Sequence, residues 1–474
     1  MGLRYLLVMS TIVALCVLSP LRPVLGLYGY YWFGMMRPDI LSWAGPNRYS
    51  LILALVTLFS NAPSILRNLP LLFTNSILRN QLVLFLLITI SVITAVDPSL
   101  CTERYLLFVR IFLMALIIPL AITKMEELRW FFVVVAGSLG LLGAKFGLFG
   151  LIHGGLKIDQ GYGGFLSDNN TLALAFAMNV PLCWFSRHFL PWRLARLGFV
   201  GLSLLCISAV LFSHSRGGAL ALGAAVLLIT LSERRKIVAL LMLLLAAGGV
   251  SYLVWDSFYN RMATLKDPMA EDSARSRIIF TTYAAPRMWL DYPLFGVGFT
   301  ETNQQRLLWK YVPPEYSVAY AGRVLHNTYA QILVDSGIFA FLVYMWLLLK
   351  TGLQTWFSAK RIAAKESMEK AAIPFAVSTS LGTFLVGATF LSRTTFDLFY
   401  VLLCATAAWI EIGKREQAQP AAAAVLHANG VSAARPAGVM ASSAGEGHPA
   451  ALAHDRARFL GRRARVRPGA PGLS

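Results

Sequence analysis

The sequence predicts an all-α protein, a polytopic transmembrane helical bundle of 12–13 helices with one large, partly helical loop outside the membrane. Composition is the first reason. The 474 residues are 57% hydrophobic and only 14% charged, whereas soluble domains are about 45–50% apolar and about 25% charged. The second reason is a series of long apolar runs, because a helix needs about 20 apolar residues to cross about 30 Å of hydrocarbon.

Thirteen apolar segments give this count of helices. They are residues 3–18, 23–36, 51–66, 79–96, 105–123, 129–152, 169–187, 194–213, 217–232, 236–255, 326–351, 372–390 and 394–411. Pro20 and Pro23 separate the first two segments, which are short and form either two crossings or one broken helix. The first segment imitates a signal peptide, but a polytopic protein more often keeps such a segment as its first helix.

Positive charge predicts the orientation of the bundle. Lys and Arg gather in alternate short connections, which resist translocation and are therefore expected in the cytoplasm. These connections lie near residues 67–79, 124–129, 187–196, 234–236 and 360–370. The remaining connections, among them those with Asp168, Arg216 and His326, then share the outer side. The net charge of +19 is explained by this pattern and a basic tail, so membrane lipid is an expected partner and nucleic acid is not.

Four parts follow from these observations. They are N-terminal transmembrane helices (1–255), an outer loop carrying arginines (256–325), C-terminal transmembrane helices (326–412) and a disordered, basic cytoplasmic tail (413–474). The tail is rich in Ala, Pro, Gly and Arg and lacks the apolar residues for a core. The five cysteines are isolated and no metal-binding motif is present, so neither a metal nor a cofactor is expected.

The outer loop and the segment that follows it hold the main candidate residues. The loop's arginines are Arg261, Arg275, Arg277, Arg287, Arg306 and Arg323. Such arginines are usually solvated, but Phe280 and Trp289 predict that this loop packs back onto the membrane domain. His326 then opens the segment 326–351. A histidine at the mouth of a membrane helix, next to an arginine-rich loop, suggests chemistry on an anionic, lipid-linked substrate.

A second candidate is the step from Ser213 to Gly218, between two helices. Free N–H groups at a helix start form an anion site, the two glycines would allow close approach, and Arg216 can bind phosphate with two hydrogen bonds. The alternative is an arginine that extends to the lipid headgroups. Beside the other arginines, phosphate binding is favoured.

Asp168, Asn169 and Asn170 precede an apolar run, which predicts a helix N-cap, with sugar binding as the alternative. Asp335 is an acid inside a membrane helix and is expected to pair with a neighbouring helix, because nine residues put it on the face opposite His326. Gly337 shares the face of the histidine and is expected to permit close helix packing.

The chain resembles the O-antigen ligase and polymerase superfamily of bacterial membrane proteins. The resemblance rests on His326-Asn327 with Asp335 and Gly337, on the Ser215–Gly217 step, and on Arg277 followed by residues 293–298. Residues 20–38 and 168–170 are most similar to the O-glycosylation ligases found with exosortase systems. The family usually has Glu in place of Asp335 and a second glycine in place of Ala340.

The resemblance implies a metal-independent, inverting glycosyltransferase in the bacterial inner membrane, with its site facing the periplasm. The donor would be a glycan on undecaprenyl diphosphate, and the acceptor a hydroxyl of a glycolipid or a protein. His326 would be the general base, and Arg216 with Arg277 or Arg275 would bind the diphosphate. Asn327 and Arg287 are further candidates for a sugar-binding or structural role.

Two other functions stay open at this point. A polymerase would use the same donor, and the sequence does not separate it from a ligase. A non-enzymatic transporter of lipid-linked sugars is disfavoured, because such proteins carry ionisable residues well inside several helices and pseudo-repeated halves.

Overall fold

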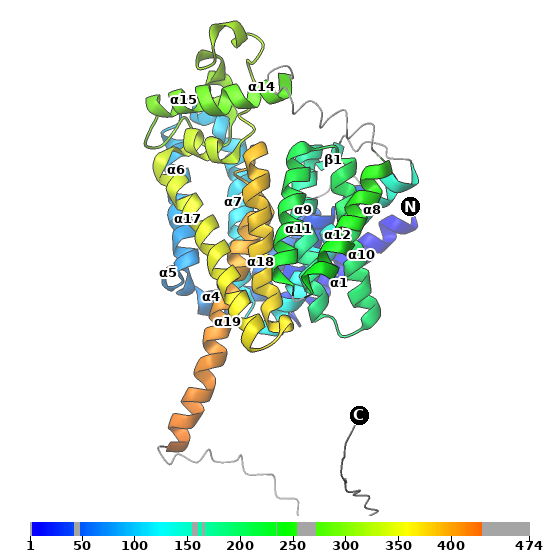
Figure 1. Ribbon diagram of the computed structural model, residues 1–474. Coiled ribbons are helices and arrows are strands. Elements are labelled where there is room, and N and C mark those ends of the chain that lie inside the picture. Colours follow the sequence, from blue (N-terminus) through cyan, green and yellow to red (C-terminus); the bar gives the residue numbers. More distant parts are fainter. Residues whose placement is uncertain are drawn as a thin grey trace, which may run out of the picture. The chain divides into compact units, whose positions relative to one another are not determined.

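The computed structural model describes residues 2–41, 48–153, 160–163, 166–233, 235–253 and 272–428. These residues form an all-α bundle, as predicted (Figure 1). Its long helices are α1 (Leu3–Leu18), α2 (Val24–Met36), α4 (Tyr49–Asn68), α6 (Ser76–Ile93), α7 (Pro98–Ala121), α8 (Met125–Ile152), α9 (Asn169–Ser186), α10 (Arg193–Phe212), α11 (Arg216–Ser232), α12 (Lys236–Leu253), α17 (Thr328–Lys365), α18 (Met368–Gly387) and α19 (Asp397–Ala428).

Each of the thirteen predicted segments is thus a helix. Within the described residues, seven helices are long and apolar enough to cross a membrane: Tyr49–Asn68, Ser76–Ile93, Pro98–Ala121, Met125–Ile152, Arg193–Phe212, Thr328–Lys365 and Met368–Phe390. The first two predicted segments are separate helices rather than one broken helix. A Cβ at Gly29 of α2 would lie 2.7 Å from the Leu15 side chain of α1, so α1 and α2 pack closely on each other.

The remaining elements of the described ranges are short. They are α3 (Pro38–Leu41), α5 (Leu71–Thr74), α14 (Asp272–Ile279), α15 (Ala285–Asp291) and α16 (Thr302–Leu307), four 3-10 turns (Arg187–Phe189, Leu308–Lys310, Pro314–Tyr316 and Ala388–Phe390), a π-helical turn (Phe280–Ala284), and an antiparallel pair of strands, β1 (Gln160–Gly163) and β2 (Leu166–Asp168). The π-helical turn lies directly before Pro286, which has no N–H for a helical bond.

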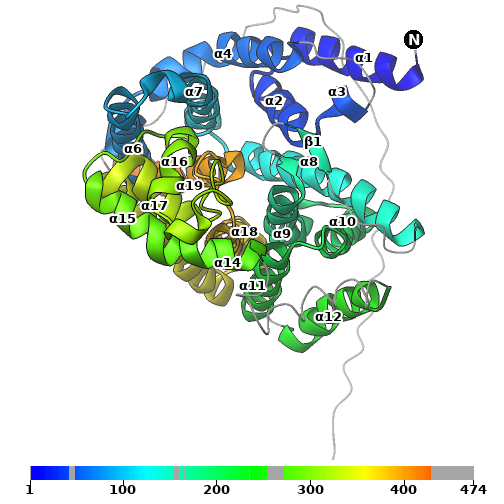
Figure 2. The same ribbon diagram turned by 90° about the horizontal axis from the view of Figure 1, so that it is seen from above.

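Helix α9 lies at the centre of one half of the bundle. Seen from above, α8, α10, α11 and α18 surround it (Figure 2). Its side chains are buried from Thr171 to Ser186, so protein encloses this helix on every face.

Several polar connections gather at one end of the bundle, here called the site end, where α9, α11 and α17 begin. The Ser215 hydroxyl donates to Asn170 Oδ1 at 2.8 Å and joins the starts of α11 and α9. The Arg393 N–H donates to Thr328 Oγ1 at 3.1 Å and joins the α18–α19 connection to the start of α17. These contacts place the starts of α9, α11 and α17 at the same end of the bundle. The alternation of basic and non-basic connections predicts the same arrangement.

The described part of the outer loop, residues 272–325, has a small apolar core of its own. Phe280, Met288, Leu308, Tyr320 and Leu325 are fully buried there, together with Val297 and with Val334 of α17. The loop therefore packs back onto the membrane domain, as its aromatic content predicts. Arg261 lies outside the described residues.

Helix α17 is interrupted at Gly337, where residues 293–298 of the outer loop insert. The Val297 N–H donates to the Val334 carbonyl and the Ile338 N–H donates to the Pro293 carbonyl, each at 2.9 Å. In a continuous helix the Ile338 N–H would bond to the Val334 carbonyl. Gly337 has a φ of 76°, and a Cβ on it would lie 2.1 Å from the Leu294 carbonyl oxygen. The expectation that Gly337 permits helix packing was wrong, because the neighbour is an extended loop segment.

The chain divides into two units, Met1–Gln419 and Pro420–Ser474. Helix α19 ends at Ala428 rather than near residue 412. Alanine has the highest helix propensity, and residues 421–424 are all alanine, which explains why helix continues into the segment predicted as a tail. Residues 429–474 lie outside the described residues.

Candidate functional site

His326 lies at the site end, one residue before the cap of α17. The cap is Asn327, whose Oδ1 accepts hydrogen bonds from the N–H groups of Tyr329 and Ala330 at 2.9 and 3.0 Å. The histidine is therefore not part of the helix, although the sequence suggests that the segment begins there. Its backbone has a φ of 53°. This left-handed conformation is unfavourable for a residue with a Cβ and persists only where the surroundings impose it.

The electrostatic surroundings of His326 keep it neutral. Burial is the largest cause and Arg277 the second, and together with Arg393 and Arg323 they lower the pKa of His326 to about 4, against the opposing charge of Asp168. Among the residues that the structure describes, none is hydrogen-bonded to the imidazole. A half-buried neutral imidazole with its ring nitrogens unoccupied can accept a proton from a bound hydroxyl group.

Arg275 and Arg277 face different surroundings. Arg275 donates to the Tyr320 hydroxyl at 3.1 Å, pairs with Asp272 and lies over the ring of Tyr316. These contacts direct it into the outer loop. Arg277 is close enough to His326 to lower its pKa. Of the two candidates that the sequence left open, Arg277 is therefore the one beside the histidine.

Arg287 lies apart from this group. It is exposed, it lies 3.3 Å over the ring of Tyr283 and it donates to the Tyr283 carbonyl one turn earlier. No described contact joins Arg287 to His326.

Arg216 is buried at the first position of α11, with Ser215 as the cap. The Ser215 Oγ accepts from the Gly218 N–H at 3.1 Å. The two glycines do not leave room for a ligand as expected. A Cβ at Gly217 would lie 2.6 Å from Phe390, and one at Gly218 would lie 2.6 Å from Ala173. They allow close packing of α11, which fixes Arg216 at the site end.

The residues before α9 have structural contacts. Asp168 caps the helix by accepting from the N–H groups of Asn170 and Thr171, as predicted. Asn169 donates to the Ser213 carbonyl at 3.2 Å, and Asn170 accepts from the Ser215 hydroxyl. These contacts align the starts of α9 and α11. Sugar binding by the two asparagines stays a prediction.

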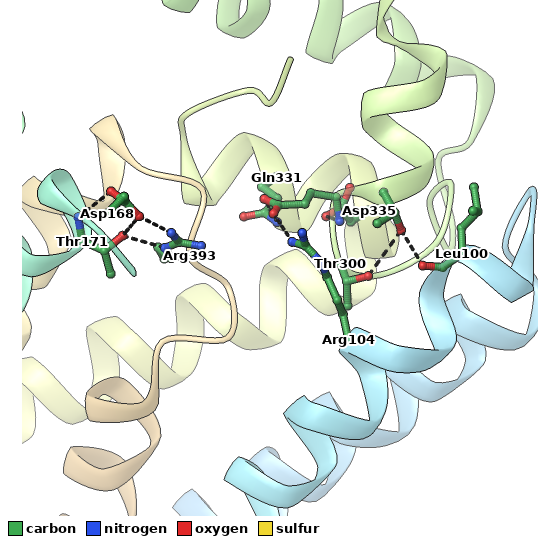
Figure 3. A network of polar contacts seen from close by, with 10 residues as sticks. Leu100, Arg104, Asp168, Thr171, Thr300, Gln331, Asp335 and Arg393 are labelled. Carbon is green, nitrogen blue, oxygen red and sulfur yellow. Dashed lines mark hydrogen bonds and ion pairs between the residues drawn. The ribbon is translucent and has the colours of Figure 1, made fainter. Parts of the chain in front are cut away.

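Arg393, which the sequence analysis passed over, completes this side of the site. It pairs with Asp168 and donates to Thr171 Oγ1 at 2.7 Å (Figure 3). Burial acts to raise the pKa of Asp168, but Arg393 and Thr171 outweigh it and hold this pKa below its ordinary value. The sequence feature that could have pointed to Arg393 is the alternation of basic and non-basic connections, because it places residues 391–393 on the outer side.

A second polar cluster lies near Asp335 (Figure 3). The Asp335 carboxylate accepts from the Glu301 N–H at 2.8 Å, and Glu301 pairs with Arg104 of α7. Burial raises the pKa of Glu301 although Arg104 opposes the effect. The prediction that a neighbouring helix supplies the partner of this carboxylate was wrong, because the inserted loop brings the Glu301 backbone to it. Ser91 of α6 bonds only to the Asp335 carbonyl oxygen.

Among the described residues there is no cluster of three or more His, Cys, Asp or Glu side chains that could hold a metal ion. The cations gathered around His326 are arginines, which suit a phosphate-bearing ligand.

The fold is that of a multi-pass membrane protein, and arginines gather around a histidine at one end of its bundle. Residues 201–345 match the family model described as O-antigen ligase. The matched range contains Arg216, Arg277 and His326 and supports the O-antigen ligase superfamily and a role in glycan transfer. Asp168 and Arg393 lie outside it. None of the curated proteins compared with the chain matches it.

Proposed function

We propose that this protein transfers a glycan from undecaprenyl diphosphate to a hydroxyl group of a glycolipid or protein acceptor. The proposed location is the periplasmic face of the bacterial inner membrane, and the proposed subgroup is the O-glycosylation ligases found with exosortase systems. The family match to residues 201–345 supports glycan transfer. One observation carries the proposal: a neutral, half-buried His326 lies among arginines from separate segments of the chain.

The proposed reaction inverts the anomeric carbon without a metal. His326 takes the proton of the acceptor hydroxyl, and the acceptor oxygen attacks the anomeric carbon on the face opposite the diphosphate. The bond from that carbon to the phosphate oxygen breaks, and its electron pair leaves with the diphosphate. Arg216 and Arg277 stabilise the charge that develops on the leaving group.

Donor binding also adjusts the base. A pKa of about 4 leaves the free histidine neutral but weakly basic. The bound diphosphate brings negative charge towards the arginines that lower this pKa. An opposite charge nearby favours the imidazolium, so the histidine becomes a stronger base once the donor is in place.

A reconstituted reaction tests the proposal. Purified protein is incubated with an undecaprenyl-diphosphate glycan and with glycolipid or protein acceptors. Transfer of the intact glycan supports the ligase, growth of the lipid-linked chain supports a polymerase, and neither product with either acceptor class contradicts both.

The orientation is tested in intact cells with single cysteines. A cysteine at Ser317 of the outer loop should react with an impermeant thiol reagent, and one at Ser367, between α17 and α18, should not. The opposite result would place the site end in the cytoplasm and exclude a periplasmic donor.

A further inference from the structure

Arg393 belongs to the short connection between α18 and α19, far in sequence from the matched range that holds Arg216, Arg277 and His326. Resting on the proposed function, we propose that Arg393 is a further donor-binding residue, which contacts the diphosphate through its Nη1 edge. Asp168 and Thr171 orient it for this contact.

The guanidinium is held along one edge only. Nε donates to Thr171 Oγ1, Nη2 pairs with Asp168 Oδ2, and the backbone N–H donates to Thr328 Oγ1. In the described part of the chain no protein group is bonded to Nη1. Figure 3 shows one nitrogen pointing away from Asp168 and Thr171. An arginine has five N–H donors in a planar fork, so fixing one edge presents the other in a defined direction.

Asp168 is itself rigidly placed. Its Oδ1 accepts two backbone N–H groups and its Oδ2 accepts the Thr171 hydroxyl as well as Arg393. A carboxylate with this many donors is occupied by the protein. Its role is therefore to position Arg393, and it keeps its negative charge because its pKa is lowered.

The position of Arg393 puts its charge where the reaction needs it. It is one of the groups that lower the pKa of His326, so its charge acts at the imidazole. Its side chain is 27% exposed, which leaves it accessible from the site. Arg306 differs, because it is 64% exposed and pairs with Asp97 at the start of α7.

The test compares Arg393→Ala, Arg393→Lys and Arg306→Ala in the full-length protein. For Arg393→Ala we expect the donor KM to rise about 10- to 100-fold, as for loss of a charge-assisted hydrogen bond, with the acceptor KM and the melting temperature unchanged. Lysine should restore part of the affinity, because it keeps the charge but not the fork. Arg306→Ala should behave as the wild type.

A positioning role for Asp168 is tested with Asp168→Asn. Asparagine caps a helix as well as aspartate does, so α9 should stay intact while the pairing with Arg393 weakens and the donor KM rises. A purely structural Arg393 would instead lower the melting temperature and kcat and leave the donor KM unchanged, which would overturn the proposal.

Direct binding separates this assignment from the proposed function. Undecaprenyl diphosphate, the product released after transfer, is titrated into each purified variant. Weaker binding to Arg393→Ala than to Arg306→Ala supports the assignment. Equal binding overturns it and leaves the proposed function standing, whereas a wild-type protein that neither binds this lipid nor transfers glycan overturns both.

Discussion

Two half-buried histidines lie at opposite ends of the bundle, His326 at the site end and His188 between α9 and α10. Burial is the largest cause at both positions and a nearby arginine the second, and each pKa is lowered to about 4. By electrostatics alone the two histidines are indistinguishable. A lowered histidine pKa therefore does not by itself mark a functional site.

The surroundings of the two histidines differ. At His188 the neighbouring arginine is Arg187, which pairs with Glu233 at 2.6 Å, donates to the Trp184 carbonyl and lies 4.1 Å over its ring. The Trp184 Nε1–H also donates to Glu233. The carboxylate of Glu233 thus binds the arginine nearest to His188, and this cluster ties the end of α9 to the end of α11.

At His326 three arginines from separate segments, Arg277, Arg323 and Arg393, act against the opposing charge of Asp168. The backbone of this histidine is left-handed, and the helix beside it is interrupted by an inserted loop. Strain of this kind, next to converging cations, is typical of a site that binds a charged ligand. Under the proposed function, His326 is therefore the functional histidine and His188 a structural one.

The largest expected effect tests this separation directly. His326→Ala should lower glycan transfer by about 10²- to 10⁴-fold, the usual contribution of acid–base catalysis, while the protein stays folded and binds donor. His188→Ala removes an equally buried imidazole and should leave transfer near the wild-type level. Initial rates at saturating donor and acceptor measure both.

If His326→Ala and His188→Ala lost glycan transfer to the same extent, His326 would have no catalytic role that His188 lacks. Near-normal transfer by a folded His326→Ala protein would leave His214 as the next candidate, because it is buried at the site end and also has a left-handed backbone, with a φ of 52°.

The interruption of α17 at Gly337 gives the second prediction. Gly337→Ala places a Cβ 2.1 Å from the Leu294 carbonyl oxygen at a φ of 76°, and backbone atoms cannot rotate away. We expect destabilisation of more than about 3 kcal/mol, at the upper end of single substitutions. Gly223→Ala in α11 meets nothing within 4 Å and should be neutral or stabilise by up to about 1 kcal/mol.

Melting temperatures of the two glycine variants, measured in the same detergent, provide the comparison. A Gly337→Ala protein that melts like Gly223→Ala would mean that residues 293–298 do not insert at the interruption of α17.

The helices were predictable because membrane crossing leaves a signal that depends on length and composition. The insertion at Gly337 was not, because it is made by backbone hydrogen bonds between Pro293, Val297, Val334 and Ile338, which carry no side-chain signature. The sequence contains glycines at 296, 298 and 337, but no sequence feature indicates that the first two lie beside the third in the fold.

For the arginines, the sequence leaves a different question open. Arg275 and Arg277 are two residues apart on α14, so at 100° per residue they point to nearly opposite sides. The sequence establishes that separation but not which side faces His326. Arg393 is a single cation in a short connection, which looks like an arginine at the headgroups until its contacts with Asp168 and Thr171 are seen.

The third prediction concerns these loop arginines. Arg277→Ala should raise the donor KM about 10- to 100-fold, because a charge-assisted contact to phosphate contributes about 1.5–3 kcal/mol. Arg287→Ala removes an arginine whose ring contact and side-chain hydrogen bond in the described structure are both to Tyr283, and it should leave the donor KM unchanged. A normal donor KM in Arg277→Ala would return the assignment to Arg275.

The smallest effect is the dependence of transfer on pH, and it sharpens the comparison of the two histidines. The free-enzyme pKa of His326 is about 4, so the imidazole is neutral from pH 8 to about 6 and kcat/KM should be flat over that range. The value of kcat/KM should fall on further acidification, as the base becomes protonated near pH 4.

In the donor complex the diphosphate raises the pKa of His326, so kcat should begin to fall at a higher pH than kcat/KM. His188→Ala should retain both profiles, because its imidazole has no part in the reaction. Coincident profiles for kcat and kcat/KM would contradict a donor phosphate bound among the arginines beside His326.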